Sequence, residues 1–426
     1  MLTVPTDRPI VSSLLEADFY KFTMGQFVWN NYQDVNVTGA LRCRTKGVRL
    51  GEIIDLGQLR EELDHIRTLR FNNSQLHYLR GTNEYGNRMF HEPYLEFLRA
   101  MSLPEYNLEK VGPDIRLEFG GPWSTQKYQE TLGLSIVDEL YTRALMKPLS
   151  RFERETVMAR ACVRLAEKIK ILRGYPDIFF SDFGTRRRAF AEWQTYVNEV
   201  LCAELPSQFL GSSNTDLAMR FGTVPMGTSA HELQMVVAGL RQGQKDWLKV
   251  SQQEVVEGWW QQYGYGLSIF LPDTYGSEFF FDNLTPQELS KWKGARWDSG
   301  DPFVFGDKLI ARYEKHGIDP KTKLIVFSDG LDIAAIVKLH TYFNGRIKTS
   351  YGWGTNLTND LWDNAWHNGL WYGPLSLVIK PATANGRGLV KLSDNPEKAT
   401  GRPEDIERYM QAVGYDRNTK HVACVY

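Results

Sequence analysis

The sequence predicts an α/β protein, an irregular α/β barrel preceded by an N-terminal α/β domain. From about residue 175 onward, short apolar runs, polar loops and helix-like segments follow one another along the chain. This alternation is typical of parallel strands joined by crossover helices. About seven such units within roughly 180 residues favour a closed or nearly closed barrel over a short open sheet. Because the loops are unevenly spaced, we expect the barrel to be irregular.

Composition supports a folded protein of more than one domain. The chain has 426 residues, and at about 150 residues per domain this predicts two or three domains. Hydrophobic residues make up 42% and charged residues 24%, which is typical of soluble globular proteins and excludes a largely disordered chain. With 50 Lys and Arg against 51 Asp and Glu, the overall charge does not indicate nucleic-acid binding.

Targeting and metal-binding patterns are absent from the sequence. No apolar run approaches the roughly 18 residues of a membrane span. Charged residues interrupt the first 21 residues, where a secretion signal needs an apolar stretch, so we expect a cytoplasmic protein that does not bind membranes. The four cysteines form no CxxC pair and the eight histidines no HExxH motif. A disulfide framework and a zinc site are therefore not expected.

Two domains are predicted along the chain. Residues 1–150 show no regular alternation and are interpreted as the N-terminal α/β domain. Residues 151–173 have an apolar stripe at helical spacing, followed by Gly174, and begin the barrel, which extends to residue 375. The tail, residues 376–426, begins within one more apolar run (LSLVIK, 375–380) and is expected to complete the N-terminal domain.

Polar loops after the predicted strands are the candidate functional segments, because residues in barrel active sites lie on the loops that follow the strands. They are SDFGTRRR (181–188), GSSNTD (211–216), PMGTSAH (225–231), LPDTYGS (271–277), RWDSGDP (296–302), FSDGLD (327–332) and YGWGTN (351–356).

Basic residues dominate the first of these loops. Arg186, Arg187 and Arg188 stand at the start of a predicted helix, where cations oppose the helix dipole. An anion bound at this point would make their placement favourable. The alternative is a solvated basic turn.

Phosphate chemistry is suggested by the third loop. His231 follows a glycine and two hydroxyl residues at a predicted helix start, a setting that suits a phosphate group. An imidazole there can attack phosphorus as a nucleophile. The alternative is a structural or merely exposed histidine.

Acidic and glycine-rich loops offer further binding groups. Asp298 and Asp301 flank a Ser-Gly turn and would bind ribose hydroxyls or Mg²⁺, or else satisfy their own backbone. SDGLD (328–332) and GWGTN (352–356) are glycine turns between a predicted strand and a predicted helix, and the second can cradle a phosphate through its backbone N–H groups. The sequence lacks GxxxxGK[ST], so any ATP must bind outside a Walker-type loop.

Taken in order, these motifs resemble the nicotinate phosphoribosyltransferase family in its bacterial form. The resemblance extends over nearly the whole chain, from DFYKFTMGQ (18–26) through the loops above to GTNLTND (354–360) and KLSDNPEK (391–398). It implies a type II phosphoribosyltransferase-like fold and a homodimer with shared active sites. It also implies ATP-coupled transfer of phosphoribosyl from phosphoribosyl pyrophosphate to nicotinate in NAD salvage, with Mg²⁺ as the metal and a transient phosphohistidine.

The resemblance also implies roles for individual residues. Phe183 and Tyr20 would sandwich the pyridine ring, with Tyr20 reaching in from the partner subunit. Arg186, Asn214 and Thr215 would complete the nicotinate pocket. The ribosyl pyrophosphate would be held by Arg296 and Asp298, its 5′-phosphate by a cradle, and the phosphoryl group by His231; the cradle residues are Asp329, Gly330, Gly352 and Gly354.

Two questions stay open from the sequence. Asn214 can either donate its amide to the nicotinate carboxylate or simply cap the following helix. The activity itself has alternatives: a nicotinamide-using or quinolinate-using phosphoribosyltransferase, or a non-catalytic nucleotide sensor. The ligands of Mg²⁺ cannot be named from the sequence.

Overall fold

A parallel sheet of seven strands occupies the centre of the computed structural model, which describes residues 8–83, 86, 88–395 and 398–414. The order of its strands is β6-β5-β4-β10-β9-β8-β7, and all neighbours run parallel. Chain order is kept around the sheet except that β6 and β7 do not pair, so it is a curled half-barrel, open on that side. The strands are β4 (Phe180–Asp182), β5 (Phe209–Ser212), β6 (Val224–Pro225), β7 (Ile269–Phe270), β8 (Gly294–Trp297), β9 (Leu324–Phe327) and β10 (Lys348–Trp353).

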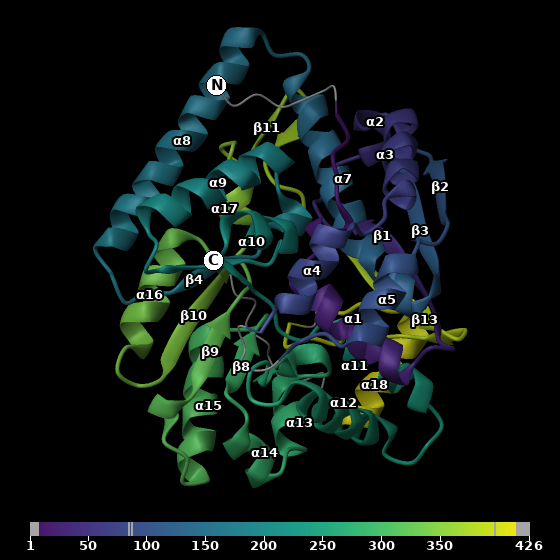
Figure 1. Ribbon diagram of the computed structural model, residues 1–426, viewed down its shortest axis with the longest axis vertical. Coiled ribbons are helices and arrows are strands. Elements are labelled where there is room, and N and C mark those ends of the chain that lie inside the picture. The colour runs from purple at the N-terminus through teal and green to yellow at the C-terminus, as the bar shows by residue number, and fades with distance from the viewer. Residues whose placement is uncertain (1–7, 84–85, 87, 396–397, 415–426) are drawn as a thin grey trace.

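Helices cover the outer face of the half-barrel, as crossover connections between parallel strands require. Figure 1 shows α8, α9, α15 and α16 outside the strands, while α11 and α12 form the long connection from β6 to β7. These helices and their shorter neighbours are α8 (Arg151–Arg173), α9 (Ala191–Glu204), α10 (Thr215–Phe221), α11 (His231–Arg241), α12 (Trp247–Tyr263), α13 (Ser277–Asp282), α14 (Pro286–Lys291), α15 (Pro302–Lys315), α16 (Ile333–Phe343) and α17 (Thr355–Thr358).

The helix predicted over residues 151–173 has those bounds in the structure. Ser150 and Glu153 form a capping box at its N-terminus, and the apolar stripe, including Leu165 and Ile169, is buried. By contrast, the helix expected to begin at the arginine cluster begins only at Ala191. The first two arginines instead lie in a short 3₁₀ turn, Thr185–Arg187.

The second sheet is antiparallel and joins both ends of the chain. Its order is β14-β13-β1-β3-β2, so that β13, from the C-terminal part, pairs with β1 from the N-terminal part. Figure 1 shows β13, in yellow, beside the purple β1. The strands are β1 (Asn36–Cys43), β2 (Tyr106–Val111), β3 (Asp114–Pro122), β13 (Leu377–Ala384) and β14 (Arg387–Gly388). Residues 415–426 of the predicted tail lie outside the described residues.

Other elements pack around this sheet or connect it to the half-barrel. The helices are α1 (Phe19–Asn31), α2 (Leu50–Ile53), α3 (Leu56–Thr68), α4 (Asn73–Gly81), α5 (Glu92–Ala100), α6 (Trp123–Gln126), α7 (Tyr128–Met146) and α18 (Pro403–Val413). The 3₁₀ turns η1 (Leu14–Glu16), η2 (Thr185–Arg187), η3 (Pro272–Thr274) and η4 (Pro320–Thr322) and the small hairpin β11 (Ala365–His367) and β12 (Leu370–Tyr372) complete the structure. No described helix combines the length and apolar character that crossing a membrane requires.

A continuous hydrophobic core joins the two sheets. Residues of α1, α7, α12 and the half-barrel strands belong to one buried cluster. At one contact between the two parts, the rings of Phe27 in α1 and Trp259 in α12 lie 6.0 Å apart. Gly258 leaves room for this packing, because a Cβ there would lie 2.9 Å from the Phe27 ring. The shared core holds α1 and α7 against the half-barrel.

Candidate active site

The seven predicted polar loops all follow strands of the half-barrel, so they lie at the carboxyl-terminal edge of the sheet. The helices α1 and α7, and the strand β13 of the antiparallel sheet, add residues to the same region. The result is one polar site assembled from distant parts of the chain.

His231 is the first residue of α11 and is held on both sides of its ring. Its Nδ1 lies 2.9 Å from the Thr274 hydroxyl and its Nε2 3.0 Å from Asp298 Oδ2. Asp273 Oδ1 lies 3.4 Å from the same Nε2. These contacts fit a neutral ring whose Nε2–H donates to Asp298 while Nδ1 accepts from Thr274.

Burial keeps this imidazole uncharged. Only 4% of the surface of His231 is exposed, and this burial lowers its pKa to about 4 in spite of the nearby carboxylates of Asp273 and Asp298. Burial alone would raise the pKa of Asp298, but Arg296, His231 and Lys391 together outweigh it and hold that pKa well below the usual range. The pair therefore consists of a neutral imidazole beside a carboxylate.

The structure separates the two aspartates of the RWDSGDP loop. Asp298 accepts hydrogen bonds from Arg296 and Ser328, at 3.2 Å and 2.9 Å, and 23% of its side chain is exposed. Asp301 instead caps α15, accepting from the backbone of Phe303 and Val304. Of the two, only Asp298 joins the polar site.

Phe183 and Gly352 meet at the ends of the paired strands β4 and β10. The Phe183 N–H donates to the Trp353 carbonyl, 2.8 Å away. A Cβ on Gly352 would lie 2.4 Å from the Phe183 ring, so glycine is required for this packing. The bulky Trp353 points to the other face of the sheet, where it packs against Phe180, and does not narrow the site.

Tyr20 and Arg186 lie together, and both come from the same chain. The Arg186 guanidinium is 5.9 Å from the centre of the Tyr20 ring, and its Nε lies 3.3 Å from Asp18 Oδ2. Within one chain Tyr20 thus already lies beside Arg186, whereas the resemblance implied that Tyr20 reaches in from a partner subunit; that arrangement stays a prediction. The shared core holds α1, which carries Tyr20, against the chain's own half-barrel.

A buried acid on α7 anchors this region. Glu130 is 2.6 Å from the ammonium of Lys21 and 3.6 Å from Arg186 Nη1. Burial opposes its ionisation, but Lys21, Lys380 and Arg186 together lower the pKa of Glu130 to about 2. Arg186 thus enters the site already paired with acids, which fixes its direction.

The three arginines of the predicted cluster have different surroundings. Arg188 is buried and bonds to Glu16 at 2.8 Å, so it is a structural residue. Arg187 is close enough to Asp138 and Asp329 to interact with both electrostatically. Arg186 alone reaches Tyr20.

Asn214 and Thr215 are fully buried and bond within the protein. Asn214 caps α10, its Oδ1 accepting from the Leu217 N–H at 3.1 Å, and its amide is directed toward Gln194. The Thr215 hydroxyl donates to the Ala17 carbonyl at 3.0 Å. These contacts hold residues 17 and 18, which precede Tyr20, and so give Asn214 and Thr215 a positioning role. Their contact with nicotinate, which the resemblance implies, stays a prediction.

Asp182 links this segment to the Phe183 loop. Its carboxylate, fully buried, accepts from Ser212, Gln194 and Asn198 at 2.7–2.9 Å. It also accepts from the Gly184 N–H at 2.7 Å. One acid thereby fastens the ends of β4 and β5 to α9.

The predicted phosphate cradle lies at the ends of β9 and β10. Gly330 has a positive φ of 61°, which its lack of a side chain permits. Asp329 forms an ion pair with Lys398 from the C-terminal part of the chain. Gly354 follows β10 directly, one residue beyond the Trp353 carbonyl that Phe183 binds.

Several charged residues of the site escaped the sequence analysis. Asp273 lies in a loop that the analysis selected, and Lys391 and Lys398 in a quoted motif, so a signal was present. Glu130 and Lys380 lie inside a helix and a strand, where nothing local marks them. Lys380, on β13, is close enough to Glu130, Arg186 and Asp298 to interact with them, and burial lowers its pKa to about 8.

Among the described residues, His231, Asp273 and Asp298 are grouped closely enough to hold a metal ion. Lys391 already lies 3.0 Å from Asp273, however, and Arg296 binds Asp298. Mg²⁺ prefers oxygen ligands and commonly combines one or two carboxylates with substrate phosphates. Of the three, the partly exposed Asp298 fits that pattern.

The fold and the site together define an enzyme for anionic substrates. A half-barrel presents cations, a carboxylate-bound neutral imidazole and an aromatic side chain at the loop edge where such folds place their chemistry. Cations and acids alternate there, so each side chain is oriented by its neighbour. On its geometry alone, therefore, the protein belongs to the class of enzymes that act on anionic substrates.

Comparison with known proteins identifies the family. Residues 178–418 match the nicotinate phosphoribosyltransferase (NAPRTase) family and residues 15–138 its N-terminal domain. A nicotinate phosphoribosyltransferase from Vibrio cholerae is 33% identical, with a TM-score of 0.86 over 98% of this chain and 96% of that one. One from Porphyromonas gingivalis is 27% identical, with a TM-score of 0.83 over 95% and 100%.

A putative nicotinate phosphoribosyltransferase from Saccharomyces cerevisiae, 24% identical, shares the fold with a TM-score of 0.81 over 97% and 100% of the two chains. The chain belongs to the nicotinate phosphoribosyltransferase family. It is an enzyme of NAD biosynthesis whose substrates are nicotinate and phosphoribosyl pyrophosphate.

Proposed function

We propose that the enzyme couples phosphoribosyl transfer to ATP hydrolysis through transient phosphorylation of His231. The imidazole would take the γ-phosphoryl group of ATP and release ADP, and water would later hydrolyse the phosphohistidine to inorganic phosphate. The observation that carries this proposal is the neutral, buried imidazole 3.0 Å from Asp298. An uncharged ring is the nucleophilic form, and a carboxylate stabilises the imidazolium charge that develops during attack.

In the transfer step the nicotinate ring nitrogen attacks C1 of the ribose and pyrophosphate leaves. No proton has to be removed from the nucleophile, so positioning and charge stabilisation do most of the work. Phe183 and Tyr20 would hold the ring, and Arg186 its carboxylate. Arg296 and Asp298 would hold the ribosyl pyrophosphate, with its 5′-phosphate against the loops of Asp329 and Gly352.

Mg²⁺ would enter with the phosphates. It would neutralise charge on the departing pyrophosphate, and Asp298 is the protein ligand we propose for it. Asp298 therefore serves three partners, the ion, Arg296 and His231. A homodimer, predicted from the resemblance, remains a prediction, as does a cytoplasmic location.

The test replaces His231 with asparagine. The variant should lose ATP hydrolysis coupled to product, while weak ATP-independent synthesis of nicotinate mononucleotide persists, because ribosyl transfer uses other residues. Wild-type enzyme incubated with γ-labelled ATP should carry an acid-labile, base-stable label that the variant lacks. His316→Asn, at the exposed end of α15, is the matched control. Full ATP stimulation in His231→Asn would disprove the assignment.

A further inference from the structure

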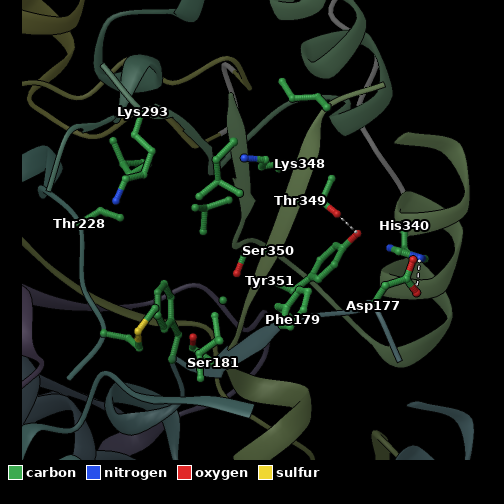
Figure 2. A pocket seen from close by; sticks show the side chains of 18 of the residues that line it. Asp177, Phe179, Ser181, Thr228, Lys293, His340, Lys348, Thr349, Ser350 and Tyr351 are labelled. Atoms are coloured by element: carbon green, nitrogen blue, oxygen red, sulfur yellow. Dashed lines mark hydrogen bonds and ion pairs between the residues drawn. The ribbon is translucent and has the colours of Figure 1, made fainter. Parts of the chain in front are cut away.

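The lumen of the half-barrel contains a cavity of about 540 Å³, and Figure 2 shows side chains that line it. At the carboxyl-terminal end of the strands its lining includes Phe183, Gly352 and Thr228. At the amino-terminal end it includes Lys321 and Lys348. Pockets of this volume accommodate ligands much larger than a single pyridine ring. One continuous space therefore joins the predicted ring subsite to the opposite side of the barrel.

The walls of the lumen suit an aromatic molecule in transit. Between the two ends the lining is apolar, with Leu210, Ile269 and Val326 on the inner faces of the strands. Ser181, which Figure 2 shows among the lining side chains, is 2% exposed, and its hydroxyl has no hydrogen-bond partner among the described residues. Buried hydroxyls are rarely left unpaired, so this one is available to a ligand.

Positive charge gathers where the lumen meets the surface. Lys321 and Lys348 are exposed and form no ion pair with any carboxylate of the described residues. A third lysine, Lys293, lines the same end and donates to the Gly266 carbonyl. The aspartate here, Asp177, is 3.1 Å from His340 Nε2. The mouth thus carries a net positive charge, which attracts small anions.

We propose that this lumen is the channel through which nicotinate, an aromatic carboxylate, reaches the active site, and that Lys321 and Lys348 collect the anion at its mouth. The inference rests on the proposed placement of the two substrates. Phosphoribosyl pyrophosphate bound by the carboxyl-terminal loops covers that face of the ring subsite. The lumen leaves the other side of Phe183 and Gly352 open, so the two substrates enter from opposite ends.

The first experiment changes the charge of the mouth. Nicotinate association is followed by stopped-flow protein fluorescence in enzyme loaded with Mg²⁺ and pyrophosphate, which cannot react because no ribosyl carbon is present. In the double variant K321E/K348E the association rate should fall about tenfold at low ionic strength. The deficit should shrink as salt screens the mouth. Lys110→Glu, on the exposed face of β2 in the other sheet, is the control and should behave as wild type.

The second experiment narrows the channel without changing charge. Leu324 lines the lumen near its amino-terminal end. Leu324→Trp should slow nicotinate association and dissociation by a similar factor, about tenfold or more, and leave the Kd unchanged, because a channel residue affects passage and not the bound state. Leu324→Ala widens the same point and should retain both rates. The KM for phosphoribosyl pyrophosphate should be unchanged in every variant.

The possible outcomes distinguish a failure of the channel proposal from a failure of the proposed function. Association rates equal to wild type in both Leu324→Trp and the lysine variant would show that nicotinate enters past the carboxyl-terminal loops, and would overturn the channel. If Leu324→Trp does not fold, as judged by its thermal transition, the exposed lysine positions decide the question alone. Failure of the wild-type enzyme to make nicotinate mononucleotide would instead contradict the proposed function.

Discussion

Asn214 shows how a buried side chain acts through its neighbours. Its Oδ1 caps α10 and its backbone pairs with that of Asp18, two residues before Tyr20. Its amide is turned toward Gln194. Of the two interpretations that the sequence left open, the structure shows the helix cap. A direct contact with nicotinate would have to use the second N–H of the amide, because the first is directed toward Gln194 Oε1.

We therefore expect Asn214→Asp to have a small effect on activity but to lower the stability of the protein. Aspartate caps helices as well as asparagine does, and the lost bond to Gln194 is a weak one of 3.5 Å. The kcat/KM for nicotinate of the folded variant should change by less than about threefold, but the free energy of unfolding should fall by about 1–3 kcal/mol, because the buried carboxylate would face Gln194 Oε1. Steady-state kinetics and urea denaturation measure both. A loss of nicotinate use in a folded variant would show that the amide meets the substrate carboxylate.

Lys380 gives the site a pH dependence. Burial lowers its pKa to about 8, so the ammonium predominates below that pH and is lost as the pH rises through it. Since this charge lies near Arg186 and Asp298, the KM for phosphoribosyl pyrophosphate should increase between about pH 7 and pH 9. Lys380→Arg keeps its charge throughout this range and should show a flatter profile. Identical profiles for the two enzymes would exclude Lys380 as the titrating group.

Among the elements, the paired ends of β4 and β10 determine the shape of the proposed ring subsite. Gly352 faces Ser181 across the pair, and its missing side chain allows the Phe183 ring to pack against the strand. Side chains alternate between the faces of a strand, so the neighbouring Trp353 packs outside against Phe180. The same alternation gives one face of β10 to the lumen and the other to the core.

Gly352→Ala should therefore displace the Phe183 ring. Overpacking of this kind costs about 1–3 kcal/mol, and we expect the KM for nicotinate to rise by about two- to tenfold if half of that cost falls on ring binding. Gly81→Ala is the control, since a Cβ there meets nothing within 4 Å. Nicotinate titration and thermal unfolding compare the two. Wild-type KM in Gly352→Ala would show that Phe183 does not hold the ring.

On the scale of the molecule, the site depends on three distant parts of one chain. The N-terminal helix α1 contributes Tyr20 and Lys21, the half-barrel contributes His231, and β13 contributes Lys380. Pairing between β1 and β13 closes this arrangement, and the common core fixes it. Each chain therefore contains both aromatic residues of the proposed ring subsite.

Mixing two inactive variants tests this arrangement. Tyr20→Ala and Phe183→Ala should each reduce activity strongly, and their mixture should regain none, because every chain lacks one of the two rings. Sites shared between subunits would behave differently, since a mixed dimer would contain one intact pair. The measurement is specific activity after the variants are denatured and refolded together, with wild type refolded in parallel. Recovery of activity in the mixture would place Tyr20 in the partner's site.

The sequence by itself determined the fold class, the bounds of α8 and the loops that surround the site, because periodicity and turn residues are local properties. It also placed His231 at the start of α11 and identified the family through motifs in order. Only the tertiary structure decided which way side chains point: Arg188 pairs with Glu16, Asp301 caps a helix, and Tyr20 meets Arg186 within one chain. Glu130 and Lys380 became visible only when α7 and β13 packed against the half-barrel. Their charges act across contacts between residues hundreds of positions apart, which no local pattern encodes.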